Sequence, residues 1–173
     1  MKEILFTLGF LFLQSVAFAN ALDDYRNELY QEIVLECNDR VGQEKAMCQC
    51  QAKMAANDVI NGLTPKEREL IIKDEELSDE VFKELETKVV IIVAQAFNDM
   101  ENAIQCSKSI YVVDCATNGT FGCNHSKGCC KCMVNAAFDN MIYKEMMETN
   151  PTPELQSKML QILNANHARC SKQ

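Results

Sequence analysis

The segment CQCQAKMA at residues 48–55 recurs in altered form as CKCMVNAA at residues 130–137. Residues two apart on an α-helix point about 200° apart, so the two cysteines of a Cys-x-Cys pair cannot bond each other without breaking the helix. Each such pair must therefore bond two different partners. This constraint predicts helices that are joined to one another by disulfides.

Further matches extend the similarity between the two halves of the chain. The segment IVLEC at 33–37 is echoed by YVVDC at 111–115, and Thr64-Pro65 returns as Thr152-Pro153. Each half ends on a late cysteine, Cys106 or Cys170. Self-similarity of this kind indicates a duplicated structural unit. We predict two divergent repeats, at about 20–106 and about 107–173.

Apolar residues recur every three to four positions through most of the chain, which is typical of amphipathic helices. One helix is expected from residue 22, with Gly42 ending it, and a second over 43–61, with Gly62 ending it; these two form a helical hairpin. The predicted fold is all-α, a disulfide-stapled bundle of two helical-hairpin repeats without a significant β-sheet.

Two later helix starts carry recognisable caps. Thr64, Pro65 and Glu67 match the residue types of a capping box with proline at the first helical position. Ser78 is expected to cap a longer helix that runs to about Cys106. The second repeat differs from the first by residues 116–128, rich in Asn, Gly, Thr and Ser, which we predict to be an inserted surface loop that carries binding residues.

The ten cysteines can be paired by applying the same spacing argument to both repeats. Exchanging Cys48 with Cys50, or Cys129 with Cys130, satisfies the same geometry nearly as well. The preferred set is Cys37–Cys48, Cys50–Cys106, Cys115–Cys130, Cys132–Cys170 and Cys123–Cys129.

The amino-terminal segment has the features of a secretory signal peptide. A charged start is followed by an apolar stretch over 4–13 and by the small-x-small pattern Ala17-Phe18-Ala19. The apolar stretch is shorter than the roughly 20 residues that a membrane span needs. We predict cleavage after residue 19, a single domain over 20–173, no membrane span after cleavage, and an extracellular or periplasmic location.

The charge of the chain limits its partners. The formal net charge is −8, and it stays so without residues 1–19 because these contain one Lys and one Glu. Nucleic acids and anionic membranes reward Lys and Arg, so neither is expected as the main partner. Cationic proteins remain open.

A metal site is the first alternative to a purely structural role for the cysteines. The residues Cys123, His125, Cys129, Cys130 and Cys132 fall within ten positions of one another. Thiolate and imidazole ligands at this density could hold Zn²⁺ or Cu(I). In an oxidising compartment, however, disulfide formation competes for the same sulfur atoms.

No pattern of catalytic residues is present in the sequence. Only His125 and His167 offer imidazoles, and the sequence contains no G-x-S-x-G motif and no phosphate-binding glycine loop. We therefore predict a non-enzymatic protein without a cofactor, which binds another protein or an extracellular ligand. The second alternative is a secreted enzyme of unrecognised type, in which acidic residues converge in a cleft. If the source is eukaryotic, Asn118 and Asn124 match the glycosylation pattern.

Overall fold

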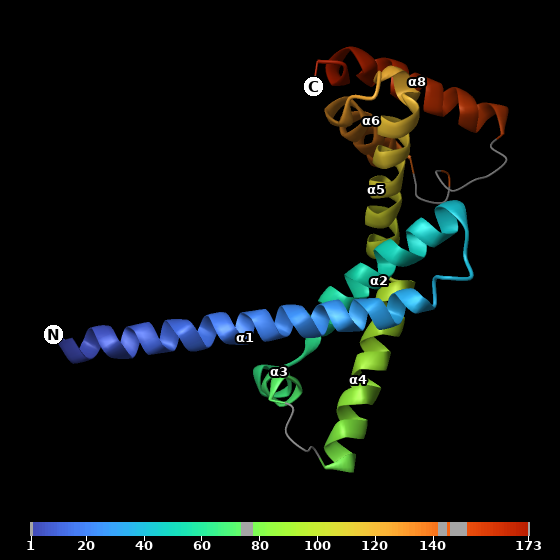
Figure 1. Cartoon of the computed structure of the whole chain (residues 1–173). Helices are drawn as coiled ribbons and strands as arrows, with labels where there is room; N and C mark the ends of the chain where they lie inside the picture. Colours follow the sequence, from blue (N-terminus) through green and yellow to red (C-terminus); the bar gives the residue numbers. More distant parts are fainter. Residues whose placement is uncertain (1, 74–77, 142–144, 146–151, 173) are drawn as a thin grey trace. The chain divides into compact units, whose positions relative to one another are not determined.

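The computed structural model describes residues 2–73, 78–141, 145 and 152–172, with side chains from residue 18 onward. These residues form helices joined by turns and contain no strand, which confirms the all-α class (Figure 1). The chain divides into two compact units, unit 1 over Met1–Asn102 and unit 2 over Ala103–Gln173. That the two halves are divergent repeats stays a prediction.

Unit 1 contains α1 (Lys2–Leu35), α2 (Gly42–Gly62), α3 (Pro65–Ile72) and α4 (Asp79–Asn98). The first two form the predicted hairpin, and the Cys37–Cys48 bridge joins its two arms with a Cα–Cα distance of 5.7 Å. Gly42 does not end the first helix as expected. Helix α1 stops at Leu35, and Gly42 begins α2 with a positive φ of 57°.

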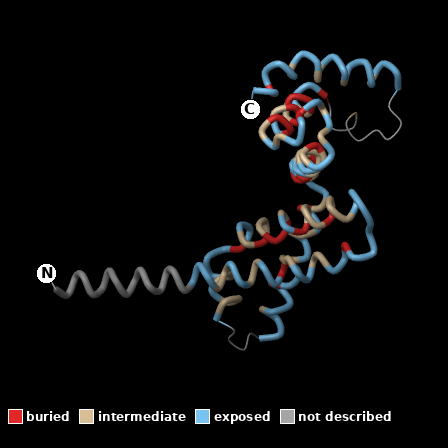
Figure 2. Tube along the Cα trace, turned by 45° about the horizontal axis from the view of Figure 1, so that its top comes forward, coloured by how far each residue is buried: buried red, intermediate tan, exposed pale blue. Residues whose placement is uncertain are grey.

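The core of unit 1 is aliphatic. Helix α2 presents a buried face of small residues to its neighbours, which Figure 2 shows in red, and α1 and α4 both pack against α2. The end of α2 lies so close to α4 that a Cβ atom at Gly62 would stand 2.9 Å from Cδ1 of Ile92. The buried residues of this core are Leu29, Ala56, Val59, Leu63 and Leu85.

The capping box at the start of α3 is confirmed. The Thr64 hydroxyl accepts a hydrogen bond from the Glu67 backbone N–H at 3.3 Å, and the Glu67 carboxylate accepts one from the Thr64 N–H at 2.6 Å. The same carboxylate binds Lys88 of α4 at 2.7 Å. Hydrogen bonding to Lys88, followed by that to Thr64, lowers the pKa of Glu67 from 4.5 to about 2.

The single long helix predicted from Ser78 to about Cys106 is wrong. Helix α4 ends at Asn98 and α5 (Met100–Asn118) begins two residues later. The residue between them, Asp99, has an extended backbone, and its carboxylate accepts hydrogen bonds from the N–H groups of Glu101 (2.7 Å) and Asn102 (3.4 Å). Aspartate thus caps a new helix, and apolar periodicity alone did not reveal this.

The segment at 116–128, predicted to be an inserted surface loop, lies mostly at the surface but contains more helical structure than expected. Helix α5 continues to Asn118, a 3₁₀ turn labelled η1 covers Thr120–Gly122, and α6 begins at Lys127. Gly119 and Gly122 adopt positive φ values of 66° and 70°, so the chain turns tightly. Cys123 within this segment is only 4% exposed. The segment is therefore a surface turn that Cys123, its one buried residue, anchors in the core of unit 2.

Unit 2 combines the later part of α5 with η1, α6 (Lys127–Asn140) and α8 (Pro153–Cys170). Its main core consists mostly of cysteine sulfur, and a smaller apolar cluster around Ala137 and Met141 joins α6 to α8. The buried residues of the main core are Cys115, Cys123, Cys129, Cys130, Met133 and Cys170.

The disulfides join the same cysteines as four of the predicted pairs. The bridges Cys37–Cys48, Cys115–Cys130, Cys123–Cys129 and Cys132–Cys170 have Cα–Cα distances of 5.4 to 5.7 Å. Cys50 and Cys106 are disulfide-bonded as well. The pairing of these last two with each other stays a prediction. Within the described part of the chain, no helix combines the length and apolarity that a membrane crossing requires.

Candidate functional site

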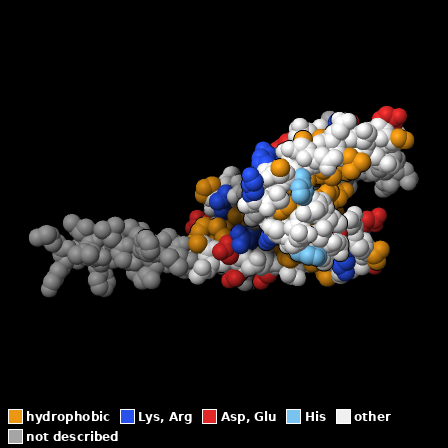
Figure 3. Space-filling model, turned by 90° about the horizontal axis from the view of Figure 1, so that it is seen from above, with side chains coloured by type: hydrophobic (Ala, Val, Ile, Leu, Met, Phe, Trp, Pro, Cys, Tyr) orange, Lys and Arg blue, Asp and Glu red, His pale blue; other side chains and the backbone are white. Residues whose placement is uncertain are grey.

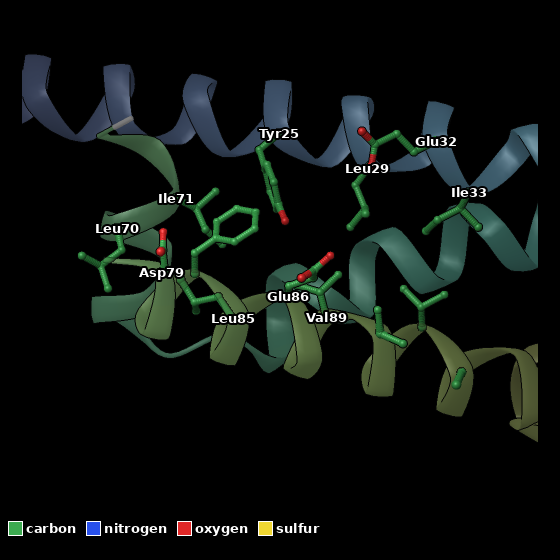
Figure 4. A pocket seen from close by; sticks show the side chains of 14 residues that line it. Tyr25, Leu29, Glu32, Ile33, Leu70, Ile71, Asp79, Leu85, Glu86 and Val89 are labelled. Atoms are coloured by element: carbon green, nitrogen blue, oxygen red, sulfur yellow. The ribbon is translucent and has the colours of Figure 1, made fainter. Parts of the chain in front are cut away.

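An apolar groove in unit 1 lies between α1, α3 and α4 (Figure 4). Its volume is about 920 Å³, which falls in the upper part of the range of ligand-binding cavities. We call it the α1–α4 groove. Its apolar lining comes from all three helices: Tyr25, Leu29 and Ile33 from α1, Leu70 and Ile71 from α3, and Phe82, Leu85, Val89, Val90, Val93 and Ala94 from α4.

The groove exists because the apolar face of α4 is wider than the surface that neighbouring helices cover. Leu85, which lines the groove, and Ala96 are covered, at 8% and 4% exposure. Phe82 and Val90 are uncovered, at 58% and 62% exposure. Both of these residues line the groove. Exposed apolar surface that is gathered in one hollow, unlike single apolar residues scattered over a surface, marks an interaction site.

Carboxylates border this apolar surface. Glu32 extends from α1, while Asp79 and Glu86 extend from α4, so that both walls carry negative charge (Figure 4). None of the lining residues is a lysine, arginine or histidine. The ion pairs found among the described residues involve none of the three carboxylates. Their charges are therefore available to a ligand.

Tyr25 brings a polar group into the same groove. Its ring projects from α1 toward α4 and carries the phenol oxygen into the hollow (Figure 4). Burial, and then the negative charge of Glu32, raise the pKa of Tyr25 above 10.0. The phenol stays protonated at neutral pH and can donate a hydrogen bond.

The predicted metal ligands are only partly brought together. The Sγ atoms of Cys115, Cys123 and Cys130 lie within 4.8 Å of one another and are buried. Two of these residues, Cys123 and Cys130, belong to the predicted set. Cys115 was missed, although its predicted bridge to Cys130 was a signal that it would lie there. We call these three residues the sulfur cluster.

The other predicted ligands have different roles. Cys129 is bonded to Cys123, and Cys132 is bonded to Cys170. The His125 ring places Nδ1 3.0 Å from the backbone oxygen of Ala116, and both histidines are exposed on unit 2 (Figure 3). Metals bind thiolates, so the sulfur cluster would have to be reduced before it could hold an ion.

The two potential glycosylation residues are both exposed. Asn118 lies at the end of α5, where its amide donates to the Asp114 carboxylate at 2.8 Å. Asn124 lies in the turn before α6 with a positive φ of 45°. Ser126 is the third residue of the glycosylation pattern that begins at Asn124. Its hydroxyl caps α6 by accepting a hydrogen bond from the Cys129 N–H at 3.3 Å. Modification of either asparagine stays a prediction.

The enzyme alternative requires acidic residues in one cleft, and the α1–α4 groove does hold three carboxylates. Its lining contains no histidine, cysteine, serine, threonine or lysine. A base or nucleophile working there would have to be a carboxylate, and Tyr25 could act only as a proton donor. The lining is otherwise suited to holding an apolar surface. Comparisons with protein-family models, with curated proteins and with solved structures gave no match.

Proposed function

We propose that this protein is an exported, non-enzymatic binding protein whose α1–α4 groove receives the apolar face of an amphipathic ligand. The observation that carries the proposal is the exposure of Phe82 and Val90, both more than half exposed inside a hollow of about 920 Å³. When a ligand covers apolar surface of this kind, burial stabilises the complex by about 25 cal/mol per Å².

The disulfides support the exported location. No cysteine is free, and several disulfides in a small protein are typical of an oxidising compartment. An extracellular or periplasmic site of action agrees with this chemistry and with the predicted signal peptide at 1–19. Packing of α1 and α4 on α2 forms the groove without a ligand, and a preformed groove loses less conformational entropy on binding.

Binding of the neutral dye Nile red to the purified, oxidised protein tests the proposal. Phe82→Asp places a charge on the apolar wall, so we expect dye binding about tenfold weaker, equivalent to about 1.4 kcal/mol. The control is Val113→Asp, because Val113 has a similar exposure, 62% against 58% for Phe82, but lies on α5. Circular dichroism checks that both variants fold. Equal dye binding by wild type and Phe82→Asp would contradict the proposal.

Soft-metal binding is a second candidate function, and the observation that favours it is the sulfur cluster. After reduction by a dithiol, Cys115, Cys123 and Cys130 would supply three thiolates from atoms that already lie within 4.8 Å of one another. Native mass spectrometry with added Zn²⁺ tests this. Zinc bound by the reduced wild type and lost in Cys115→Ser would support the candidate; no zinc on the reduced wild type would exclude it.

A further inference from the structure

The length of the α1–α4 groove distinguishes it from a compact small-molecule pocket. Its residues on α4 run from Asp79 to Ala94 and recur every three to four positions. At 1.5 Å per residue, this stripe is about 22 Å long. Helices α1 and α4 pack on the same neighbour, α2, and face each other across the groove (Figure 4). A ligand that fills this space must be long and must present a continuous apolar stripe.

An α-helix meets that requirement best. An amphipathic helix exposes apolar residues at every third and fourth position, the same repeat that α4 presents. Its apolar side would cover Phe82 and Val90, and its flank would contact the wall formed by α1. Packed helices have axes 8 to 10 Å apart, so one inserted helix can contact both walls.

The three carboxylates that border the groove specify the polar residues of the bound helix. Asp79 and Glu86 are seven residues apart on α4, which is two turns or about 10.5 Å. Glu32 adds a third carboxylate on the α1 wall, and no lining residue carries positive charge. A partner with Lys or Arg two turns apart would match this pattern. Exposed ion pairs are worth about 0 to 1 kcal/mol each, so they select and orient the partner while the apolar contact supplies affinity.

From shape and charge together, we infer that the occupant of the α1–α4 groove is a basic amphipathic helix of another protein, with Lys or Arg at positions i and i+7 beside an apolar stripe. This inference rests on the proposed function, because it names the partner of the same groove. It also agrees with the net charge of −8, which favours cationic partners at long range.

The test uses three synthetic peptides of equal length. One is an amphipathic helix with an apolar stripe and Lys at i and i+7, the second has Glu at those two positions, and the third has the first peptide's composition in scrambled order. Fluorescence anisotropy measures their binding to the oxidised protein. We expect the Lys peptide to bind at least about tenfold more tightly than the other two, and this preference to shrink at high salt because ions screen exposed charges.

Charge-removing variants locate the contact. Glu86→Gln should weaken binding of the Lys peptide several-fold, because it removes one of the three carboxylates that border the groove. Glu84→Gln is the matched control, since Glu84 is an exposed glutamate of α4 that does not line the groove. Equal effects of the two substitutions would overturn the inference.

The outcomes separate this inference from the proposed function. If Nile red binding depends on Phe82 but the Lys and Glu peptides bind equally, the basic helix is wrong and the apolar binding role stands. If the scrambled peptide binds as well as the ordered one, general charge attraction explains the binding and the helix is again wrong. If neither dye nor peptide binds, both proposals fail.

Discussion

The two units hold their helices together in different ways. Unit 1 packs α1, α2 and α4 around an aliphatic core that includes Val59 and Leu63, both 2% exposed or less. Unit 2, over 103–173, fills its main core with cysteines that form the bridges Cys115–Cys130, Cys123–Cys129 and Cys132–Cys170. Short segments bury little apolar surface, so covalent links compensate for a small core.

The difference also explains where the candidate site lies. In unit 1 the α1–α4 groove shares Leu29 and Leu85 with the aliphatic core and adds the exposed Phe82 and Val90. The core of unit 2 is instead rich in cysteine and includes Cys123, which anchors the surface segment that contains it. In unit 1 the wide apolar face of α4 therefore contributes both to the core, through Leu85, and to exposed surface, through Phe82 and Val90.

Reduction of the disulfides should reveal the largest difference in stability between the two units. Three bridges in unit 2 contribute about 2 to 4 kcal/mol each, so their loss should unfold α6 and α8. Unit 1 should keep much of α2, because its aliphatic core stays intact. Hydrogen exchange measured by mass spectrometry, with and without a phosphine reductant, checks this. Equal loss of protection in α2 and α6 would show that both units depend on disulfides alike.

A cavity in the aliphatic core should have the next largest effect. Leu63→Ala removes a side chain that is 2% exposed, and such truncations cost about 2 to 5 kcal/mol. Leu35→Ala is the control because Leu35 is 64% exposed, and it should cost less than about 0.5 kcal/mol. Chemical denaturation of the oxidised proteins gives both values. Similar costs for the two variants would mean that packing does not hold unit 1.

The sulfur cluster predicts that loss of one cysteine in unit 2 disturbs a second bridge. Cys129→Ser frees Cys123, whose Sγ lies within 4.8 Å of both sulfurs of the Cys115–Cys130 bridge. The Cys123 thiolate can attack this bridge, form a new S–S bond with one of its sulfurs and release the other as a thiolate. Loss of the Cys123–Cys129 bridge, which closes a short loop, should itself lower the free energy of unfolding by about 2 kcal/mol.

Peptide mapping of non-reduced digests detects the exchange. We expect part of Cys129→Ser to contain Cys123 bonded to Cys115 or Cys130. In unit 1, Cys37→Ser frees Cys48 and serves as the control, because no comparable cluster surrounds Cys48 in the described residues. Cys123 recovered only as a thiol would contradict the prediction.

The smallest effect concerns pH and the contact between α3 and α4. The pKa of Glu67 is lowered from 4.5 to about 2, mainly by hydrogen bonding to Lys88. Its contribution to stability is therefore present above pH 4.5 and is lost as the pH falls toward 2. The pair is near the surface, so the contribution should stay below about 1 kcal/mol.

Unfolding of wild type and Glu67→Gln at neutral pH and near pH 2 measures this contribution. The difference between the two proteins should be largest at neutral pH and should nearly vanish near pH 2, where the wild-type carboxylate becomes protonated. Glu84→Gln provides the reference for loss of an exposed α4 carboxylate outside the described ion pairs. A difference that does not change with pH would contradict the assigned role of Glu67.

Local chemistry made several features of the fold predictable. The residues Thr64, Pro65 and Glu67 each favour the same helix start, so the capping box of α3 followed from sequence. The spacing of the cysteines led to the pairs now seen as Cys37–Cys48 and Cys132–Cys170. These predictions worked because each depends on geometry within a few residues or on a constraint that a helix imposes.

Other features depend on contacts that sequence patterns do not contain. Asp99 interrupts a periodic apolar pattern by capping α5, and the pattern alone continues across it. Burial of Cys123 within the segment 116–128 depends on its bridge to Cys129. The α1–α4 groove was missed because Phe82 and Leu85 have the same apolar character, and only the packing shows which one is covered.

The difference in exposure among the apolar residues of α4 has a consequence for how this protein can change over evolutionary time. Substitutions at Leu85 or Ala96 alter the core and are expected to be selected against. Substitutions at Phe82 or Val90 alter an exposed surface and cost little stability. Descendants of this sequence could therefore acquire new partners through a few mutations along one helix, while the buried residues of that helix keep the fold unchanged.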